Sequence, residues 1–220
     1  MHIRESIWIR DRLAAIRDED LFPVLDVGSS TLDYRTRVQP FVDANVFAPL
    51  RARGGTVVHT DIKRAPGVDI VGDLLDPSFR EHLRSLGVRT ALVNNLLHHL
   101  PDRAPVARAV AEIVPCGGFI LVSGPYRYPR HYDPIETMYR PTPEEAAAEF
   151  PGTEIVERAI IDSGNWRSWT AGERGGRSLG RFLIRIAAPF HRPGEWARTV
   201  PHVPYLFKHM KAYAALLRKR

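Results

Sequence analysis

PVLDVGSS (residues 23–30) is the stretch that decides the fold. An aliphatic run ends there at one glycine, Gly28, and small hydroxyl residues follow it. A short buried strand that stops at a glycine turn is typical of nucleotide-binding α/β proteins, in which the turn faces the ligand. A dinucleotide-binding turn has the pattern G-x-G-x-x-G, because the pyrophosphate must approach bare backbone. Two of these three glycines are absent here, so we expect a nucleotide-like ligand without a pyrophosphate.

Strand-like and helix-like segments alternate along the first 125 residues. We predict strands at 23–27, 56–60, 68–71, 90–93 and 119–123, and helices at 4–18, 41–53, 77–86 and 102–114. This alternation indicates βαβ units and a doubly wound, mostly parallel sheet with helices on both faces. In such sheets the ligand lies beyond the carboxyl ends of the strands. The predicted strands end in glycine or polar residues, which suits a binding rim.

The second half of the chain is less regular. We predict a helix at 142–150, a strand at 154–162 and a basic amphipathic segment at 179–188, whereas 203–220 fits either a strand or a helix. The length of 220 residues fits a single domain over residues 1–220, with an N-terminal helix within residues 1–20.

Composition narrows the class of protein. The single cysteine, Cys116, excludes an intramolecular disulfide. We find no apolar run of about 18 residues, the length needed for a transmembrane helix, and we expect a cytoplasmic protein. Residues 171–220 hold eleven Lys or Arg against two Glu, a formal charge of +9, which leaves −3 for the first 170 residues. We interpret this basic segment as a solvated arginine-rich face, and contact with nucleic acid or an anionic membrane surface is the alternative. The dispersion of the arginines argues against nucleic acid.

The run from Val24 to Thr31 resembles motif I of the class I S-adenosylmethionine-dependent methyltransferases, whose usual pattern is D-x-G-x-G-x-G. This chain keeps the acid, Asp26, and the first glycine, and it has Ser30 and Leu32 where the later glycines usually lie. Four further segments are similar to the family's motifs in the expected order, at 57–61, 72–74, 95–102 and 115–122. The resemblance covers residues 20–125 and implies a Rossmann-like sheet of seven strands.

The same resemblance implies the ligands and the residues that bind them. It implies S-adenosylmethionine as cofactor and a small molecule as methyl acceptor. Asp61 would accept hydrogen bonds from the ribose hydroxyls, and Asp73 would meet the adenine amino group. The implied cofactor-binding residues are Asp26, Gly28, Ser29, Ser30, Asp61, Ile62, Asp73, Leu74, Asn94 and Asn95. Residues 124–220 would supply the insertions on the acceptor side and the basic C-terminal segment.

Methyl transfer depends mainly on orientation and on exclusion of water, although a hydroxyl or amine acceptor often also needs a base. Candidate bases are His98 and His99 beyond the fourth predicted strand, and Tyr126 and His131 beyond the fifth. A structural role beside the pocket is the alternative for the two adjacent histidines. We expect no metal ion, because adjacent histidines should point apart and no paired-ligand spacing supports them.

Three functions are consistent with these residues. The first is methyl transfer to a small molecule. The second is a catalytically silent protein of the same fold that acts as a binding or assembly partner, which the altered motif I would allow. The third is methylation of nucleic acid or at a membrane surface, because the basic segments 179–188 and 208–220 could lie on anionic lipid or phosphate.

Overall fold

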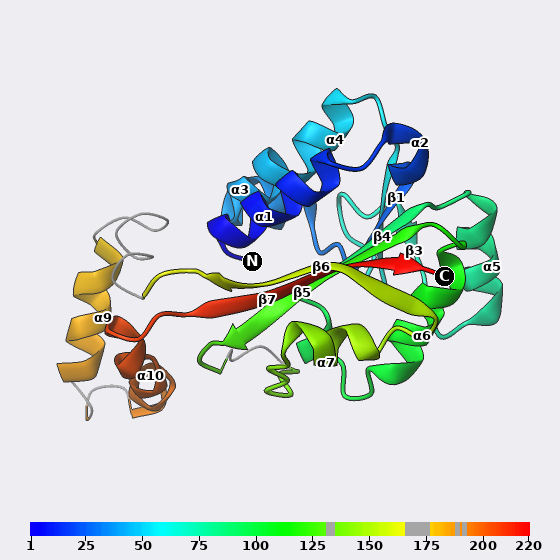
Figure 1. The fold of residues 1–220 in the computed structure, drawn as a ribbon. Helices are drawn as coiled ribbons and strands as arrows, with labels where there is room; N and C mark the ends of the chain where they lie inside the picture. Colours follow the sequence, from blue (N-terminus) through cyan, green and yellow to red (C-terminus); the bar gives the residue numbers. More distant parts are fainter. Residues whose placement is uncertain (131–134, 166–176, 188–189, 191–192) are drawn as a thin grey trace.

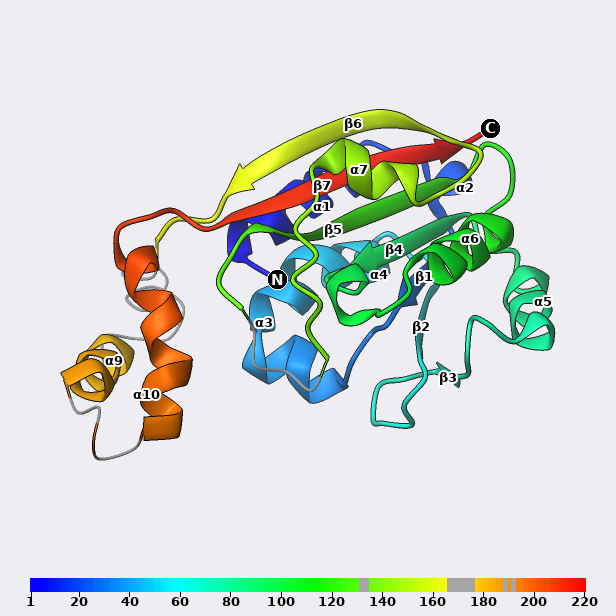
Figure 2. The same cartoon turned by 90° about the horizontal axis from the view of Figure 1, so that it is seen from below.

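A seven-stranded sheet with the order β3-β2-β1-β4-β5-β7-β6 forms the centre of the molecule (Figures 1 and 2). The computed structural model describes residues 1–130, 135–165, 177–187, 190 and 193–220. The strands are β1 (Val24–Val27), β2 (Val57–Asp61), β3 (Ile70–Val71), β4 (Thr90–Asn94), β5 (Phe119–Arg127), β6 (Thr153–Asp162) and β7 (Lys211–Lys219). Strands β1 to β5 pair in parallel, and β7 runs antiparallel to both β5 and β6. The predicted sheet is confirmed.

Helices cover both faces of this sheet (Figure 1). One face carries α1 (Ile3–Ala14), α2 (Asp18–Leu21), α3 (Pro40–Val42) and α4 (Ala48–Ala52), together with two π-helical turns, η1 (Tyr34–Val38) and η2 (Asp43–Phe47). The other face carries α5 (Pro77–Ser85), α6 (Ala104–Ile113) and α7 (Pro143–Ala148), and the 3₁₀ turn η3 (Leu97–His99) contributes to the same core.

The core consists of two apolar clusters, one on each side of the sheet. Successive residues of a strand point to opposite faces, so the buried central strands supply both clusters. Leu25 belongs to the cluster that includes residues of α5, α6 and α7, whereas its neighbour Val24 belongs to the cluster that includes residues of α1 and α4. This double burial explains why the central strands are nearly continuous apolar runs in the sequence.

Three segments differ from their predicted form. The helix predicted at 41–53 is divided into α3, η2 and α4, since Pro49 has no N–H to donate to the preceding turn. Residues 4–18 hold α1 and the first residue of α2 instead of one helix. Strand β5 continues four residues beyond its predicted end at Ser123 because it pairs with β7 as far as Arg127, with a register shift after Pro125.

A helical insertion separates β6 from β7. It contains α9 (Arg177–Ala187), α10 (Pro193–Thr199) and the 3₁₀ segment η4 (Val200–Leu206), and it projects beyond the end of the sheet (Figures 1 and 2). Residues 203–220, for which the sequence fits either a strand or a helix, thus form the end of the 3₁₀ segment η4 and then strand β7. Among the helices that the structure describes, none has the length and apolar composition to cross a bilayer.

Candidate functional site

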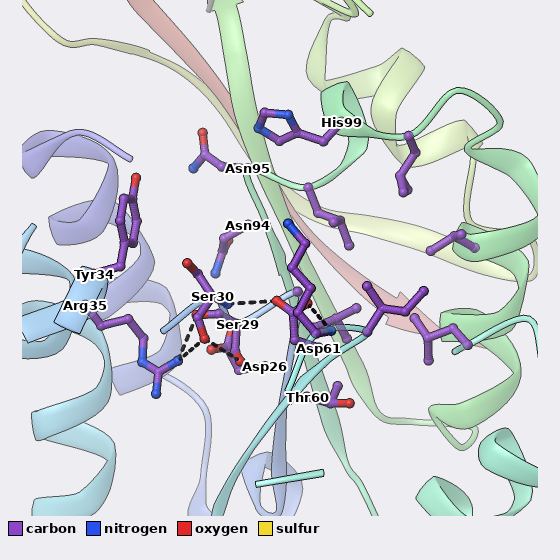
Figure 3. A pocket seen from close by; sticks show the side chains of 18 of the residues that line it. Asp26, Ser29, Ser30, Tyr34, Arg35, Thr60, Asp61, Asn94, Asn95 and His99 are labelled. Carbon is purple, nitrogen blue, oxygen red and sulfur yellow. Dashed lines mark hydrogen bonds between the residues drawn. The ribbon is translucent and has the colours of Figure 1, made fainter. Parts of the chain in front are cut away.

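A cavity of about 720 Å³ opens at the carboxyl ends of β1, β2 and β4 (Figure 3). The strand order places β2 and β3 on one side of β1, and β4 and β5 on the other. The winding of the sheet reverses between β1 and β4, and ligands of doubly wound sheets bind at this reversal. All ten residues predicted to contact the cofactor line this cavity: Asp26, Gly28, Ser29, Ser30, Asp61, Ile62, Asp73, Leu74, Asn94 and Asn95.

The turn after β1 keeps a left-handed backbone at two positions. Gly28 has φ 69° and Ser30 has φ 59°. A Cβ atom at residue 28 would lie 2.9 Å from Cδ1 of Leu96, so glycine is favoured there by space as well as by conformation. At residue 30 the serine adopts a conformation that costs about 1–2 kcal/mol for an L-residue. Ser30 therefore has a left-handed backbone at the position where motif I usually has its second glycine.

Hydrogen bonds from β2 hold this turn. The N–H groups of Gly28 and Ser29 both donate to the carbonyl of Thr60, at 2.9 and 3.0 Å. The Asp61 carboxylate accepts the N–H of Ser30 through Oδ2 at 3.0 Å and the N–H of Lys63 through Oδ1 at 3.0 Å (Figure 3). Asp61 is half-buried at the cavity wall, with a carboxylate whose position is fixed from two sides.

A buried arginine supports the same turn from the opposite side. Arg35, on η1, is 3% exposed and lines the cavity. Its Nη1 donates to the carbonyls of Ser29 at 2.8 Å and Ser30 at 3.3 Å, and its Nη2 donates to the carbonyl of Gly67 at 2.7 Å (Figure 3). No carboxylate among the described residues forms an ion pair with it, so its charge is stabilised by peptide dipoles. The sequence analysis missed Arg35, since its three acceptors meet only in the folded chain.

Asp26 lies in the cavity wall between β1 and β2. It is buried, and its Oδ2 lies 2.8 Å from Nδ1 of His59, its register partner on β2. The edge of the His59 ring packs against Phe47, with ring centroids 4.8 Å apart. One carboxylate oxygen of Asp26 is thus engaged in joining the two strands.

The end of β4 is tied to the N-terminal helix. Asn95, with φ 53°, donates from Nδ2 to Oε1 of the buried Glu5 on α1 at 2.7 Å. The hydroxyl of Ser123 on β5 donates to the same oxygen at 2.7 Å. Sequence analysis also missed Glu5, although a signal was present: Glu5, Ile9 and Leu13 recur every four residues and share the buried face of α1.

The two candidate histidines lie together at the cavity. His98 is buried, His99 is half-buried, and their ring centroids are 4.0 Å apart. The expectation that the rings point apart is wrong, because both residues lie in the 3₁₀ turn η3, where successive side chains do not alternate as in a strand. The segment after residue 134 covers this turn, since the Ile135 carbonyl lies 2.7 Å from Nδ1 of His99 and Thr137 donates to the His98 carbonyl.

Neither of the other two candidate bases is among the described residues that line the cavity. Tyr126 lies on β5, half-buried against the core cluster on the α6 side, and does not line the cavity. His131 lies outside the described residues. Within the described ranges, no group of three His, Cys, Asp or Glu side chains is placed to hold a metal ion.

A second polar cluster lies outside the cavity, beside α7. The Tyr139 hydroxyl donates to Oε1 of Glu149 at 3.1 Å, and the Arg103 guanidinium lies 3.8 Å above the Tyr139 ring centroid. Burial, followed by the negative charge of Glu149, raises the pKa of Tyr139 to about 12. Burial also raises the pKa of Tyr213, on β7, well above its usual value. Both phenols are therefore protonated at neutral pH.

Comparison with solved structures finds the same fold in proteins of very different sequence. Coclaurine N-methyltransferase, bound to N-methylheliamine and SAH, matches with a TM-score of 0.59 and 13% identity over 99% of this chain and 70% of that chain. An S-adenosylmethionine-dependent methyltransferase from Anabaena variabilis has a TM-score of 0.56 and 11% identity over 99% and 84%. The [4+2]-cyclase SpnF has a TM-score of 0.58 and 15% identity over 99% and 81%.

These likenesses define the architecture. The chain has the class I S-adenosylmethionine-dependent methyltransferase fold, as the motifs predict. No protein-family model matches the sequence. No curated protein matches it by sequence either.

Proposed function

We propose that the chain is an S-adenosylmethionine-dependent methyltransferase that acts on a small-molecule acceptor. The observation that carries the proposal is the position of Asp61. It ends β2 at the cavity where the winding reverses, and two backbone N–H groups hold its carboxylate beside the turn after β1. An acid in that place suits the two hydroxyls of a ribose, because a charged acceptor forms strong, short hydrogen bonds with them.

The chemistry of the cavity wall supports a sulfonium nucleoside. Asp61 and Asp73 are acidic, which favours a ligand that carries a cationic centre. Ile62 and Leu74 supply apolar surface for a purine ring, and Ser29 is placed to bind polar groups at the opposite end. The cavity lacks the exposed glycine-rich backbone that a pyrophosphate requires, and its volume of about 720 Å³ is within the usual range for small-molecule and cofactor sites.

Bound S-adenosylmethionine supplies an electrophilic methyl group, and the chain's own residues then orient the acceptor and receive its proton. His99 is the proposed base. Its Nδ1 must carry a hydrogen, because the Ile135 carbonyl that it contacts can only accept one. In that tautomer Nε2 holds the lone pair that a base needs. His98 and the buried end of η3 would position this ring and exclude water.

Calorimetry with S-adenosylmethionine and with S-adenosylhomocysteine tests the proposal. We expect saturable binding with one site per chain. Absence of heat at millimolar ligand would overturn it. Turnover is then measured as release of S-adenosylhomocysteine in the presence of panels of hydroxyl, amine and carboxylate acceptors, with His99→Ala as the variant that should lower kcat while leaving cofactor affinity unchanged.

A second candidate is a protein of this fold that does not transfer methyl groups. The structural match to the [4+2]-cyclase SpnF supports this second candidate, because that protein has the same architecture. Binding of S-adenosylhomocysteine without its formation from S-adenosylmethionine, for any acceptor, would support this second function.

A further inference from the structure

The insertion between β6 and β7 (residues 163–210) leaves large apolar side chains in solvent. Among the described residues, the three most exposed large hydrophobic side chains all belong to it: Phe190 is 97% exposed, Phe207 75% and Ile184 69%. Large exposed apolar side chains gathered in one short insertion favour a binding role for that insertion.

These side chains remain exposed although the insertion has packing of its own. Phe182 and Leu206 are buried, and the Trp196 indole N–H on α10 donates to the Ile186 carbonyl on α9 at 3.1 Å. Thr199 is also buried, and its hydroxyl donates to the Glu195 carbonyl. The exposed residues are therefore those left over after α9 and α10 have packed together.

The sequence of the insertion is also strongly basic. Residues 163–210 hold eight Arg or Lys and two Glu, a formal charge of +6, although the whole chain carries only +6. An α-helix turns by about 100° per residue, so positions 177, 181 and 184 share the side of α9 that is opposite Phe182 and Ile186. The exposed Ile184 thus lies on the same side of the helix as two positions that the sequence fills with arginine.

We propose that this insertion docks on an anionic lipid bilayer. Basic residues are attracted to anionic headgroups, and apolar side chains on the same face enter the boundary between headgroups and acyl chains. The other occupants fit less well. A second copy of the insertion would bring +6 against +6, and nucleic acid offers no apolar phase for Ile184 or Leu183.

The place where the insertion leaves the sheet adds a geometric reason. Asp162, the last residue of β6, is in register with Lys211, which is also opposite Arg127 at the end of β5. The insertion thus starts and ends at the carboxyl edge of the sheet, the edge at which the cavity opens. Its base is fixed by the Asp162–His209 contact at 2.8 Å and by the Ser163 N–H to the Met210 carbonyl.

Co-sedimentation of the full chain with vesicles tests the proposal without using cofactor or acceptor, so it is independent of the proposed function. We expect binding to equimolar phosphatidylcholine and phosphatidylglycerol, weakened by salt, and none to phosphatidylcholine alone. The double variant Ile184→Asp, Phe190→Asp should reduce the partition by roughly tenfold or more, because it replaces apolar contacts with charges of the wrong sign. Both sites are exposed, and circular dichroism checks that the variant is folded.

The matched control is Val156→Asp, which makes a similar change at an exposed residue of β6 outside the insertion. It should bind vesicles nearly as the unchanged chain does. Three results would overturn the proposal: equal binding to neutral and anionic vesicles, equal loss in the Val156 control, or no vesicle binding together with a dimer or an RNA complex that the double variant loses.

Discussion

The carboxylate of Asp61 accepts the backbone N–H of Ser30 at 3.0 Å, so the last residue of β2 fixes the turn that follows β1. The contact joins two segments 31 residues apart. It also gives Asp61 two tasks, because the carboxylate that holds the turn is the one proposed to bind the ribose. Changes at either residue should therefore alter both stability and ligand affinity.

Asp61→Asn tests this double role. The amide keeps one oxygen but places an N–H₂ group where the carboxylate accepts a hydrogen bond. We expect S-adenosylhomocysteine to bind roughly tenfold more weakly or worse by calorimetry, since a charge-assisted bond is lost. Asp33→Asn is the control, because Asp33 is exposed in the same turn region and does not line the cavity. Equal affinities in both variants would contradict the assignment.

The substitutions Ser30→Gly and Gly28→Ser should change the free energy of unfolding in opposite directions. Ser30→Gly removes the strain of a left-handed serine, about 1–2 kcal/mol, and adds a chain-entropy cost of about 0.5–1 kcal/mol. The free energy of unfolding should therefore rise by up to about 1.5 kcal/mol. Gly28→Ser adds strain and a close contact with Leu96, and should lower it by at least about 1 kcal/mol. Urea unfolding measures both, and a loss of stability in Ser30→Gly would refute the account of the turn.

Arg35→Lys should behave as a severe substitution. A single ammonium cannot reach the Ser29 carbonyl and the Gly67 carbonyl in the directions that the planar guanidinium serves. We expect a loss of about 2 kcal/mol in the free energy of unfolding, because buried carbonyls lose their donors. Arg37→Lys, two residues further on and largely exposed, should change stability little. Indistinguishable urea midpoints for the two variants would count against the structural role of Arg35.

The raised pKa of Tyr139 should make the free energy of unfolding fall at alkaline pH. Its folded-state pKa is about 12, whereas an unfolded tyrosine ionises near 10. The folded state thus retains its proton longer, so this contribution to stability is complete below about pH 10 and is lost as the pH rises toward 12. Tyr139→Phe has no proton to lose there. Its free energy of unfolding should fall less between neutral pH and about pH 11 than that of the unchanged chain, and parallel declines would rule the contribution out.

The sequence predicts the residues that line the cavity better than the residues that support them. Residues such as Gly28, Asp61 and Asn94 follow buried strands, and parallel strands bring their ends to one edge regardless of the helices between them. Arg35 is different, because its acceptors at 29, 30 and 67 converge only after β2 has paired with β1. The end of β5 likewise depends on β7, because the antiparallel partner of Arg127 is Lys211, which lies 84 residues further along the chain.

The insertion and the cavity lie at the same edge of the sheet. The long β6–β7 hairpin holds α9 and α10 beyond the sheet, on the edge where the strand ends form the cavity (Figure 2). A bilayer bound to the insertion, as proposed above, and a molecule entering the cavity would therefore approach the protein from the same side. With the proposed docking, a substrate dissolved in the bilayer would reach the cavity by diffusion in two dimensions, so its amount per unit area of bilayer would govern the rate of encounter.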